Sequence, residues 1–275
     1  MTDESSPRPS GDQPPEGVDD SVPQSARIWN YWLGGKDNYP IDREVADQFS
    51  RLYPPIVDLA RAQRYFLARS VRYLAGEAGI RQFLDIGTGL PTVDNTHEIA
   101  QRAAPDARIV YVDNDPLVLM HARALLTSRP EGVTDYVDAD LRDTAAIVRG
   151  AGKTLDFTRP VAISMLGILG HIAPYDTARS IVRRLLDAVP SGSYLVIADG
   201  TNVFGGRALD EAMQVWNASA EPPYILRTPE QIAGFFAGLE LVDPGVVSVP
   251  QWRPDPSPFA LPADVDNFGG VGKKP

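Results

Sequence analysis

Residues 83–89, with the sequence FLDIGTG, predict the fold more directly than any other stretch of the chain. They complete a short apolar strand over residues 82–86, and two glycines follow where that strand ends. Glycine has no Cβ, so the backbone there can turn sharply and approach a ligand closely. In an open α/β sheet, ligands bind beyond the carboxyl ends of the strands, near the first strand. We therefore expect Gly87, Thr88 and Gly89 to contact a ligand.

The rest of the chain alternates between helical and strand patterns. Apolar residues recur at three- and four-residue steps over residues 56–74 and 181–189, as on one face of a helix. Strands separated by helices form βαβ units and a mainly parallel sheet. The sequence therefore predicts an α/β fold with an open, Rossmann-like, doubly wound sheet that ends in an antiparallel edge. The expected strands are 82–86, 108–113, 135–140, 161–166, 194–198 and one or two within 239–249, with further helices at 96–103, 116–126 and 231–236.

The composition excludes several classes of protein. The chain has 275 residues and 29.9 kDa, which suits one large domain, and it has no cysteine, which excludes disulfides, Cys-ligated zinc and thiol nucleophiles. Its formal net charge is −10, so we expect no nucleic-acid partner, because such proteins need a basic face. The longest nearly apolar run, residues 161–173, is too short to span a bilayer, and the N-terminus lacks a signal-peptide pattern. We expect a cytoplasmic protein with no membrane contact.

The first 24 residues differ in composition from the rest of the chain. They contain five prolines and six acidic residues against one basic residue, a formal charge of −5. A segment with almost no apolar surface cannot offset the entropy that it loses on ordering. We predict a disordered, acidic, proline-rich tail over residues 1–24.

Polar residues also follow the second and third expected strands. Asp113, followed by Asn114, ends the second strand 24 residues after Gly89. A carboxylate at this position can accept hydrogen bonds from both hydroxyls of a ribose. Asp140 and Leu141 follow the third strand, where Asp140 is placed to accept a hydrogen bond from an adenine amino group. Together these strand ends predict a cofactor that contains adenosine.

The details of the glycine loop favour S-adenosylmethionine over a dinucleotide. A dinucleotide site requires a third small residue after the two glycines, and the sequence here continues with Leu90, Pro91 and Thr92. Pro91 also removes an N–H donor close to the place of a pyrophosphate. Asp85, two residues before the first glycine, would attract the cationic methionine part of S-adenosylmethionine or orient the loop beside it.

Six motifs of the chain are shared with a known family. They are SAR and YWLGGKDNY between residues 25 and 39, FLDIGTGLPT at 83–92, YVDNDP at 111–116, SGSYL at 191–195 and GKKP at 272–275. With these motifs the chain resembles the S-adenosyl methyltransferase family, a largely actinobacterial group first catalogued as a domain of unknown function. The resemblance covers nearly everything after residue 24. It implies the seven-stranded class I methyltransferase sheet and S-adenosylmethionine as cofactor, and it implies no particular acceptor.

Two positions depart from the pattern of that family. His171 lies one position away from the usual histidine, and Asp199 and Gly200 replace a more common Ser-His pair. These positions face the substrate in the family. The resemblance therefore leaves the substrate class of this protein open.

Residues 25–79 precede the expected sheet. We interpret them as a helical lid over the cofactor, followed by the methyltransferase domain at residues 80–275, although the same segment could simply pack under the sheet. Arg27 and Lys36 are the expected cofactor contacts of this lid. Arg64 either clamps the cofactor carboxylate bidentately or lies on a solvated helix face.

The sequence leaves the catalytic group open. Tyr31, His171 and Asp199 are candidates for a general base, although methyl transfer does not always need one. No two of the three histidines have the spacing of metal ligands, so we expect no metal. The sequence EPPY at 221–224 imitates the Asn/Asp-Pro-Pro-Tyr loop of amino-methylating DNA enzymes. It begins with Glu and follows the fifth strand instead of the fourth, so we treat the likeness as coincidence.

These observations predict a methyltransferase that uses S-adenosylmethionine and transfers a methyl group to a small-molecule acceptor. Two alternatives stay open at this point. One is a non-catalytic S-adenosylmethionine-binding sensor or regulatory protein, and the other is an NAD(P)-dependent oxidoreductase. The oligomeric state cannot be predicted from the sequence.

Overall fold

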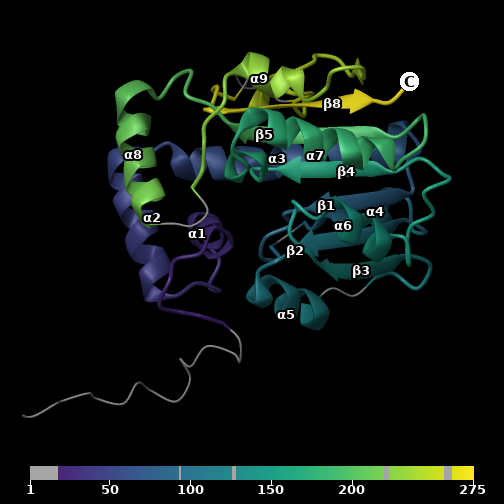
Figure 1. Cartoon of the computed structure of the whole chain (residues 1–275), viewed down its shortest axis with the longest axis horizontal. Coiled ribbons are helices and arrows are strands. Elements are labelled where there is room, and N and C mark those ends of the chain that lie inside the picture. The colour runs from purple at the N-terminus through teal and green to yellow at the C-terminus, as the bar shows by residue number, and fades with distance from the viewer. Residues whose placement is uncertain (1–17, 93, 126–127, 220–222, 257–261) are drawn as a thin grey trace, which may run out of the picture.

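The computed structural model describes residues 18–92, 94–125, 128–219, 223–256 and 262–275. Within these ranges, eight strands form one sheet in the order β3-β2-β1-β4-β5-β8-β6, with β7 paired to β8 (Figure 1). The strands are β1 Gln82–Ile86, β2 Arg108–Asp113, β3 Val133–Asp138, β4 Ala162–Leu166, β5 Tyr194–Gly200, β6 Glu240–Leu241, β7 Val247–Ser248 and β8 Asn267–Lys273. The predicted α/β fold with a doubly wound sheet is confirmed.

The first five strands are parallel, and β8 is antiparallel to its neighbours. The described sheet has eight strands where the family resemblance implied seven, because the last edge is divided. Both β6 and β7 pair with β8, and Pro244 and Gly245 lie between them. β8 itself can lie close to β5 because it is rich in glycine: a Cβ on Gly269 would fall 2.6 Å from the Ile197 carbonyl oxygen.

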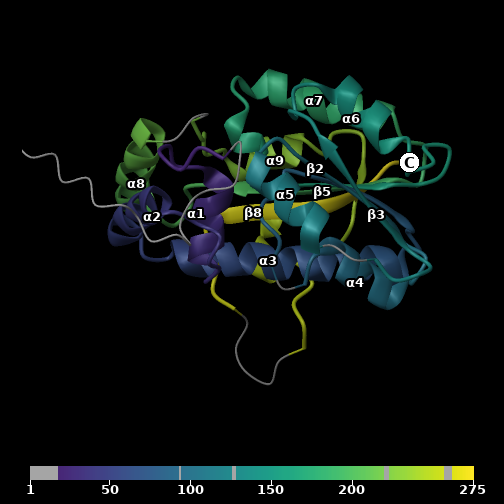
Figure 2. The same cartoon turned by 90° about the horizontal axis from the view of Figure 1, so that it is seen from below.

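Two layers of helices cover the sheet (Figure 2). One face packs against α6 Thr144–Ala151, α7 Tyr175–Asp187 and α9 Pro229–Gly234. The other packs against α3 Ile56–Arg72, its π-helical end Tyr73–Glu77 and α4 Thr96–Ala103. Strand residues alternate between the two cores, as Leu84 and Ile86 face one and Phe83 the other.

A third apolar cluster lies beyond the carboxyl ends of the strands. It joins α1 Ser25–Trp32 and α2 Pro40–Leu52 with α8 Gly206–Ser219, which follows β5 in the chain. Trp32 of α1 stacks on Trp216 of α8 with ring centroids 5.9 Å apart. We call these three helices the cap, and Figure 1 shows them side by side at the left of the sheet.

The cap therefore differs from the predicted lid over residues 25–79. α3, which was assigned to the lid, packs against the cap with its first residues and against the sheet with its later ones, and α8 comes from the segment assigned to the methyltransferase domain. Apolar periodicity identifies such helices but does not show which partner each apolar face packs against.

The predicted tail is only partly described. Residues 1–17 lie outside the described residues. Residues 18–24, for which we also predicted disorder, are held in place: the guanidinium of Arg27 donates hydrogen bonds to the carbonyl oxygens of Asp19 and Val22. Composition alone does not show a buried arginine that binds backbone carbonyls.

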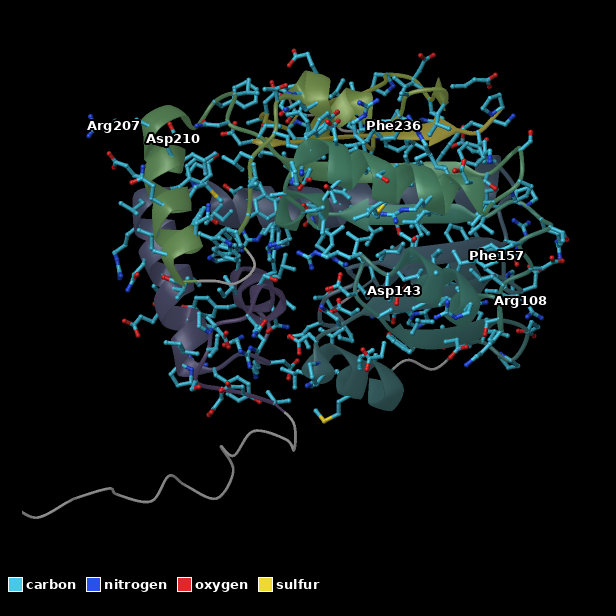
Figure 3. The ribbon with its side chains drawn as sticks, in the orientation of Figure 1. Arg108, Asp143, Phe157, Arg207, Asp210 and Phe236 are labelled. Atoms are coloured by element: carbon cyan, nitrogen blue, oxygen red, sulfur yellow. The ribbon has the colours of Figure 1, made fainter. Side chains whose placement is uncertain are left out.

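Local sequence determines where several helices begin. Asp143 accepts a hydrogen bond from the Ala146 N–H at the start of α6, and Asn95 and Glu98 form a capping box at the start of α4. Figure 3 shows Asp143 at the amino end of α6 and Phe236 beside β8, where it belongs to the core. No helix in the described ranges is long and apolar enough to cross a membrane.

Candidate functional site

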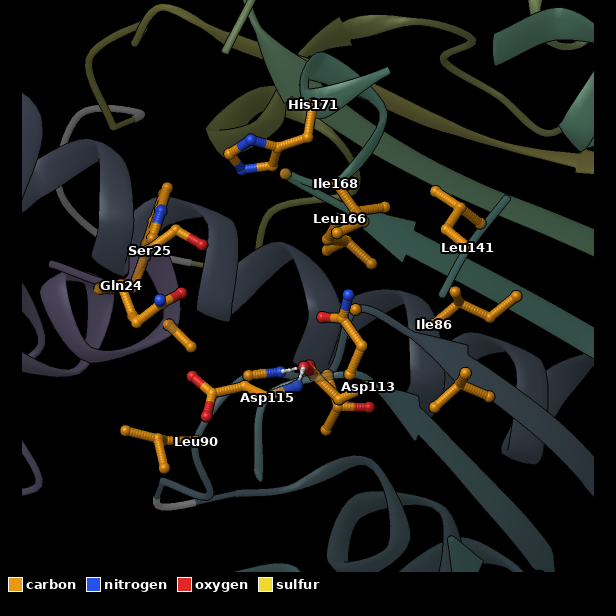
Figure 4. A pocket seen from close by; sticks show the side chains of 18 of the residues that line it. Gln24, Ser25, Ile86, Leu90, Asp113, Asp115, Leu141, Leu166, Ile168 and His171 are labelled. Carbon is orange, nitrogen blue, oxygen red and sulfur yellow. Dashed lines mark hydrogen bonds between the residues drawn. The ribbon is translucent and has the colours of Figure 1, made fainter. Parts of the chain in front are cut away.

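A cleft of about 500 Å³ lies beyond the carboxyl ends of β1, β2 and β4, between the sheet and the cap (Figure 4). This volume is typical of a site for one small ligand. Most of the predicted site residues line it: Arg27, Arg64, Asp85, Gly87, Thr88, Gly89, Asp113, Asn114, Asp140, Leu141 and His171. Tyr31, Lys36 and Asp199 do not.

The glycine loop forms the floor of the cleft beside β1. Gly87 and Gly89 have φ angles of +72° and +66°, which side chains with a Cβ rarely adopt. A Cβ on Gly87 would lie 2.8 Å from Cγ1 of Ile168, whereas nothing lies within 4 Å of a Cβ on Gly89. Thr88 donates a hydrogen bond to the Asp85 carbonyl oxygen, which fixes the turn. The loop therefore presents bare backbone to the cleft at Gly89.

Two carboxylates lie next to this loop at the end of β2. Asp113 accepts hydrogen bonds from the Gly89 N–H at 2.9 Å and the Asp115 N–H at 3.0 Å, one on each oxygen. A carboxylate oxygen has more than one acceptor position, so both oxygens of Asp113 can still bind ligand hydroxyls. Burial raises the pKa of Asp113. Asp113 therefore lies in the cleft with acceptor positions that its two backbone donors do not fill.

Asp115 is a second acceptor, which we did not predict. Its Oδ1 accepts the Leu117 N–H at 2.8 Å, and its buried Oδ2 has no hydrogen-bond partner among the described residues. Figure 4 shows its carboxylate beside Asp113 on the wall of the cleft. A buried acceptor without a donor is costly, so a ligand hydroxyl or amine would be stabilised here. The sequence signal was present, since Asp115 stands two residues after Asp113.

The loop after β3 forms a further wall. Asp140 and Leu141 both line the cleft, as does the exposed Asn114 after β2. Asp140 is not an isolated acceptor, because Arg142 donates to its Oδ2 at 3.0 Å. Leu141 is buried and adds an apolar surface. This combination suits an adenine ring, which has an apolar face and a polar edge.

Asp85 lies at the bottom of the cleft, where it holds other parts of the site together. Its carboxylate accepts hydrogen bonds from the hydroxyls of Thr96 at 2.6 Å and Ser164 at 2.8 Å, and burial raises its pKa. The charge of Arg64 on α3 partly offsets that rise. Arg64 also donates to the Asp94 carbonyl oxygen at 3.0 Å. It thus lies at the cleft and not on a solvated helix face, the alternative left open above.

The opposite end of the cleft contains His171. It ends the short 3-10 helix Leu169–His171 after β4, and Figure 4 shows its ring above Ile168 at the far side from Asp113. This ring and the ring of Tyr224 pack edge to face, with centroids 4.9 Å apart. The side-chain amide of Asn217 on α8 makes two hydrogen bonds with the backbone of Tyr224. It accepts from the Tyr224 N–H at 2.8 Å and donates to the Tyr224 carbonyl oxygen at 3.0 Å.

Two of the three candidate bases are not in the cleft. Asp199 is fully buried behind it, where it accepts a hydrogen bond from the Tyr224 hydroxyl and pairs with Arg227 at 3.3 Å. Burial raises the pKa of Asp199 to about 6. Tyr31 donates to Asp47 on α2 at 3.0 Å, away from the cleft. Position next to a strand end or in a shared motif does not reveal which way a side chain points.

Of the two cofactor contacts predicted in the N-terminal segment, Lys36 lies outside the cleft and Arg27 binds other protein groups. Lys36 is exposed outside the cleft, and its loop is folded around the Asn30 side chain, which accepts from the Asp37 N–H at 3.0 Å. Arg27 reaches the cleft, but its guanidinium is bound to backbone carbonyls and to Asp42, with Nε 3.2 Å from Oδ2. Arg27 and the Asn30 side chain therefore help to maintain the fold of this segment.

Several lining residues were missed altogether. Gln24 and Ser25 face the cleft from the start of α1, Gln63 from α3, and Val18 and Asp19 from the preceding segment. Only Ser25 stands in one of the shared motifs, SAR, and none stands at a strand end, so the sequence carried no signal for the other four.

The other two histidines and the part of the EPPY motif that the structure describes contact neighbouring protein side chains. His97 is buried and bonded to the Tyr111 hydroxyl, and His121 lies 3.7 Å from Asp37. Of the EPPY motif, residues 221 and 222 lie outside the described residues, while Tyr224 packs on His171. Among the described residues, no group of three or more acidic or histidine side chains is placed to hold a metal.

Comparison with known proteins identifies the family. The sequence model described as S-adenosyl methyltransferase matches residues 11–275. The chain belongs to the S-adenosyl methyltransferase family. The resemblance seen in the sequence is thereby confirmed, and S-adenosylmethionine is the cofactor that this family uses. A nicotinamide cofactor is no longer an alternative.

Two solved structures of other S-adenosyl methyltransferase relatives are closely similar along the whole chain. A DUF574 family protein from Streptomyces avermitilis is 46% identical, with 94% of this chain and 99% of that chain covered and a TM-score of 0.89. A protein from Thermobifida fusca is 42% identical, with 95% and 98% covered and a TM-score of 0.86. A SAM-dependent methyltransferase from Anabaena variabilis, 14% identical with a TM-score of 0.51 over 92% and 96% of the two chains, shares the fold. A search of curated proteins gives no match.

The residues of the cleft fit the cofactor of an S-adenosyl methyltransferase. Within the described part of the chain, Asp115 Oδ2 is a buried acceptor without a donor, and Gly89 leaves open space where a Cβ would project. Of the basic residues that line the cleft, Arg27 and Arg142 are paired with carboxylates. A cleft with this excess of carboxylates suits a ligand with an ammonium and a sulfonium and opposes a pyrophosphate.

Proposed function

We propose that this protein is a methyltransferase that transfers the methyl group of S-adenosylmethionine to a small-molecule acceptor. The observation that carries the proposal is the pair of carboxylates Asp113 and Asp115 beside the bare backbone of Gly89. Backbone N–H groups of the described residues donate to both oxygens of Asp113 and to one oxygen of Asp115. Acceptor positions on both carboxylates therefore stay available for the two hydroxyls of a ribose. The family of the chain is consistent with this function.

In this proposal each wall of the cleft holds one part of the cofactor. Asp113 and Asp115 accept from the ribose hydroxyls, and Asp140 with Leu141 receives the adenine. Arg64 binds the carboxylate of the methionine part. Asp85 keeps the glycine loop in position, because its carbonyl oxygen accepts a hydrogen bond from Thr88. S-adenosylmethionine supplies an electrophilic methyl group on its sulfonium.

The acceptor would bind at the end of the cleft that contains His171. If the acceptor is a hydroxyl or a protonated amine, a ring nitrogen of His171 takes its proton as the new bond to the methyl carbon forms. The other work of the protein is alignment and the exclusion of water. The cap supports this role, because its helices cover the carboxyl ends of the strands where the acceptor must enter (Figure 1).

The cap also supports a small acceptor. A site buried between a sheet and a helical cap admits a small molecule more readily than the backbone of a folded macromolecule. The formal net charge of −10 opposes a nucleic-acid substrate.

Thermal unfolding with added ligands tests the cofactor directly. A ligand at about 100 times its dissociation constant adds roughly 2.7 kcal/mol, which raises the Tm of a protein of this size by about 5–10 °C. We expect this shift with S-adenosylmethionine and S-adenosylhomocysteine and none with NADH. A shift with NADH alone would refute the proposal.

A non-catalytic S-adenosylmethionine sensor is the second candidate. It is favoured by one observation, that of three candidate bases only His171 reaches the cleft. Incubation with methyl-labelled S-adenosylmethionine and fractions of small metabolites separates the two. Label that moves to a metabolite with the wild type, and not with a folded Asp113→Ala variant, establishes the enzyme.

A further inference from the structure

The segment before α1 crosses the edge of the cofactor cleft. Residues 18–24 contain no helix or strand, and three of them, Val18, Asp19 and Gln24, line the cleft. Figure 4 shows Gln24 at one wall with Asp115 and Leu90 below it. We call residues 18–24 the strap. It was predicted to be part of a disordered tail, so nothing in the sequence gave it a role at the site.

One end of the strap contacts the sheet side of the cleft. Val18 packs against an apolar cluster of Leu90, Leu117 and Val118. Leu90 directly follows the glycine loop, and the other two belong to α5 Pro116–Leu125, which begins just after Asp115. Val18 therefore packs against an apolar cluster whose members follow the glycine loop and the proposed ribose contacts Asp113 and Asp115 in the chain.

The other end of the strap is fixed to the cap by Arg27. This side chain is 1% exposed, and its two terminal nitrogens donate to the Asp19 and Val22 carbonyl oxygens. Its Nε lies 3.2 Å from Asp42, which is fully buried in α2. Asp42 also accepts the Gln24 N–H at 2.9 Å. The planar guanidinium thus joins two strap carbonyls to one cap carboxylate, a geometry that a lysine cannot reproduce.

We propose that the strap forms the outer wall of the cofactor site and that Arg27 is its positioning residue. The inference rests on the proposed function, since it takes the ligand of the cleft to be S-adenosylmethionine or its product. A ligand between the glycine loop and the strap leaves only when the strap lifts. The strap can lift without unfolding the sheet, because it has few apolar contacts and no strand pairing, and such segments open at low free energy. It therefore sets the rate at which the cofactor product dissociates.

The test compares dissociation rates of S-adenosylhomocysteine from full-length variants in a stopped-flow displacement experiment. Val18→Ser removes the apolar contact with the sheet side and is expected to speed dissociation about fivefold. Val203→Ser is the matched control, because Val203 is 47% exposed and lies outside the cleft. It is expected to leave the rate within about twofold of wild type.

Arg27→Lys tests the anchor at the other end. It keeps the charge beside Asp42 but loses the fork that binds two carbonyls, so dissociation is expected to speed up about tenfold. Amide hydrogen exchange over residues 18–24 gives a second readout, which a general loss of stability would not move selectively. We expect faster exchange there in Arg27→Lys, and slower exchange there in wild type when S-adenosylhomocysteine is added.

Each outcome has a distinct meaning. Faster dissociation from Val18→Ser and Arg27→Lys, with Val203→Ser unchanged, supports the strap. If S-adenosylhomocysteine slows exchange at residues 87–89 but not at residues 18–24, and both strap variants release it at the wild-type rate, the strap is overturned and the proposed function stands. If wild type does not bind S-adenosylhomocysteine at all, the proposed function fails, and the inference fails with it.

Discussion

The two ends of the cleft are built in different ways. The cofactor end consists of residues that directly follow β1, β2 and β3, with Gly89 and Asp113 as its centre. The acceptor end is assembled from remote segments: His171 follows β4, Tyr224 packs on it from behind, and Asn217 of α8 holds Tyr224 in place. At the first end, backbone geometry determines what binds. At the second, side chains that are distant in sequence determine it.

This difference shows where one fold can vary without losing its cofactor. Changes in the cap or at Tyr224 alter the acceptor end and leave the strand ends untouched. Changes in the glycine loop or at the end of β2 affect every reaction that uses the cofactor. The two ends should therefore respond differently to substitution.

The largest effect is expected at the centre of the cofactor end. Asp113→Ala removes an acceptor of ribose hydroxyls and also the partner of the Gly89 and Asp115 N–H groups, so the affinity for S-adenosylmethionine should fall about 100-fold. Isothermal titration calorimetry measures it. Asp138→Ala is the matched control, because Asp138 pairs with Asp113 in the sheet register but is exposed outside the cleft. Equal affinities for the two folded variants would remove Asp113 from the site.

The buried carboxyl of Asp199, behind the acceptor end, should make the stability of the protein depend on pH. Burial raises its pKa from 3.8 to about 6, so between pH 4 and 6 the folded state binds more protons than the unfolded state. The free energy of unfolding therefore falls as pH rises through this window. Relative to Asp199→Asn, which lacks the titration, wild type should lose roughly 2–3 kcal/mol between pH 4 and pH 7. Urea unfolding at several pH values measures the difference, and parallel curves would contradict it.

Alanine substitutions at two glycines distinguish the effect of backbone strain on stability from the effect of ligand contact on affinity. Gly89 and Gly79 both have positive φ and open space around a Cβ, but only Gly89 lines the cleft. Replacement of either by alanine should lower the free energy of unfolding by about 1 kcal/mol. Gly89→Ala alone should also weaken S-adenosylmethionine binding about tenfold, because its methyl group projects toward the ligand. Similar affinities for both variants would show that the loop does not approach the cofactor.

The smallest effect is expected at Lys36. The residue is exposed outside the cleft, so Lys36→Ala should change S-adenosylmethionine affinity by less than about twofold. The same calorimetric titration measures it. A loss of tenfold or more would show that the loop around Asn30 closes over the cofactor, and the cofactor end would then extend into the cap.

The same contrast explains how far the sequence could predict the structure. β1, α4 and β2 were predicted with their observed bounds, because their apolar patterns are local signals, and glycines also flank β1. Asp113 and Gly89 lie at strand ends, and the parallel order of the strands brings such ends together. Asp115 could have been added by the same logic.

The acceptor end could not be predicted in this way. Tyr31 and Asp199 stand in suitable places along the chain, but one side chain turns toward α2 and the other is buried behind the cleft. α2, α6 and α8 were not predicted as helices, and the pairing of α8 with α2 depends on the stacking of aromatic rings from distant segments. Such contacts are properties of the tertiary structure, since no local pattern specifies which apolar faces meet.

The place of β8 in the sheet has a consequence for how the protein folds. β8 lies between β5 and β6, and its residues 267–273 pair with β5 residues 194–200. During synthesis, β5 therefore presents an unpaired edge while about 70 further residues are added. A parallel half-sheet could form early, whereas closure depends on contacts of high sequence separation, which form slowly. The growing chain is most exposed to edge-to-edge aggregation in this interval, and a chaperone that shields β5 would help it most.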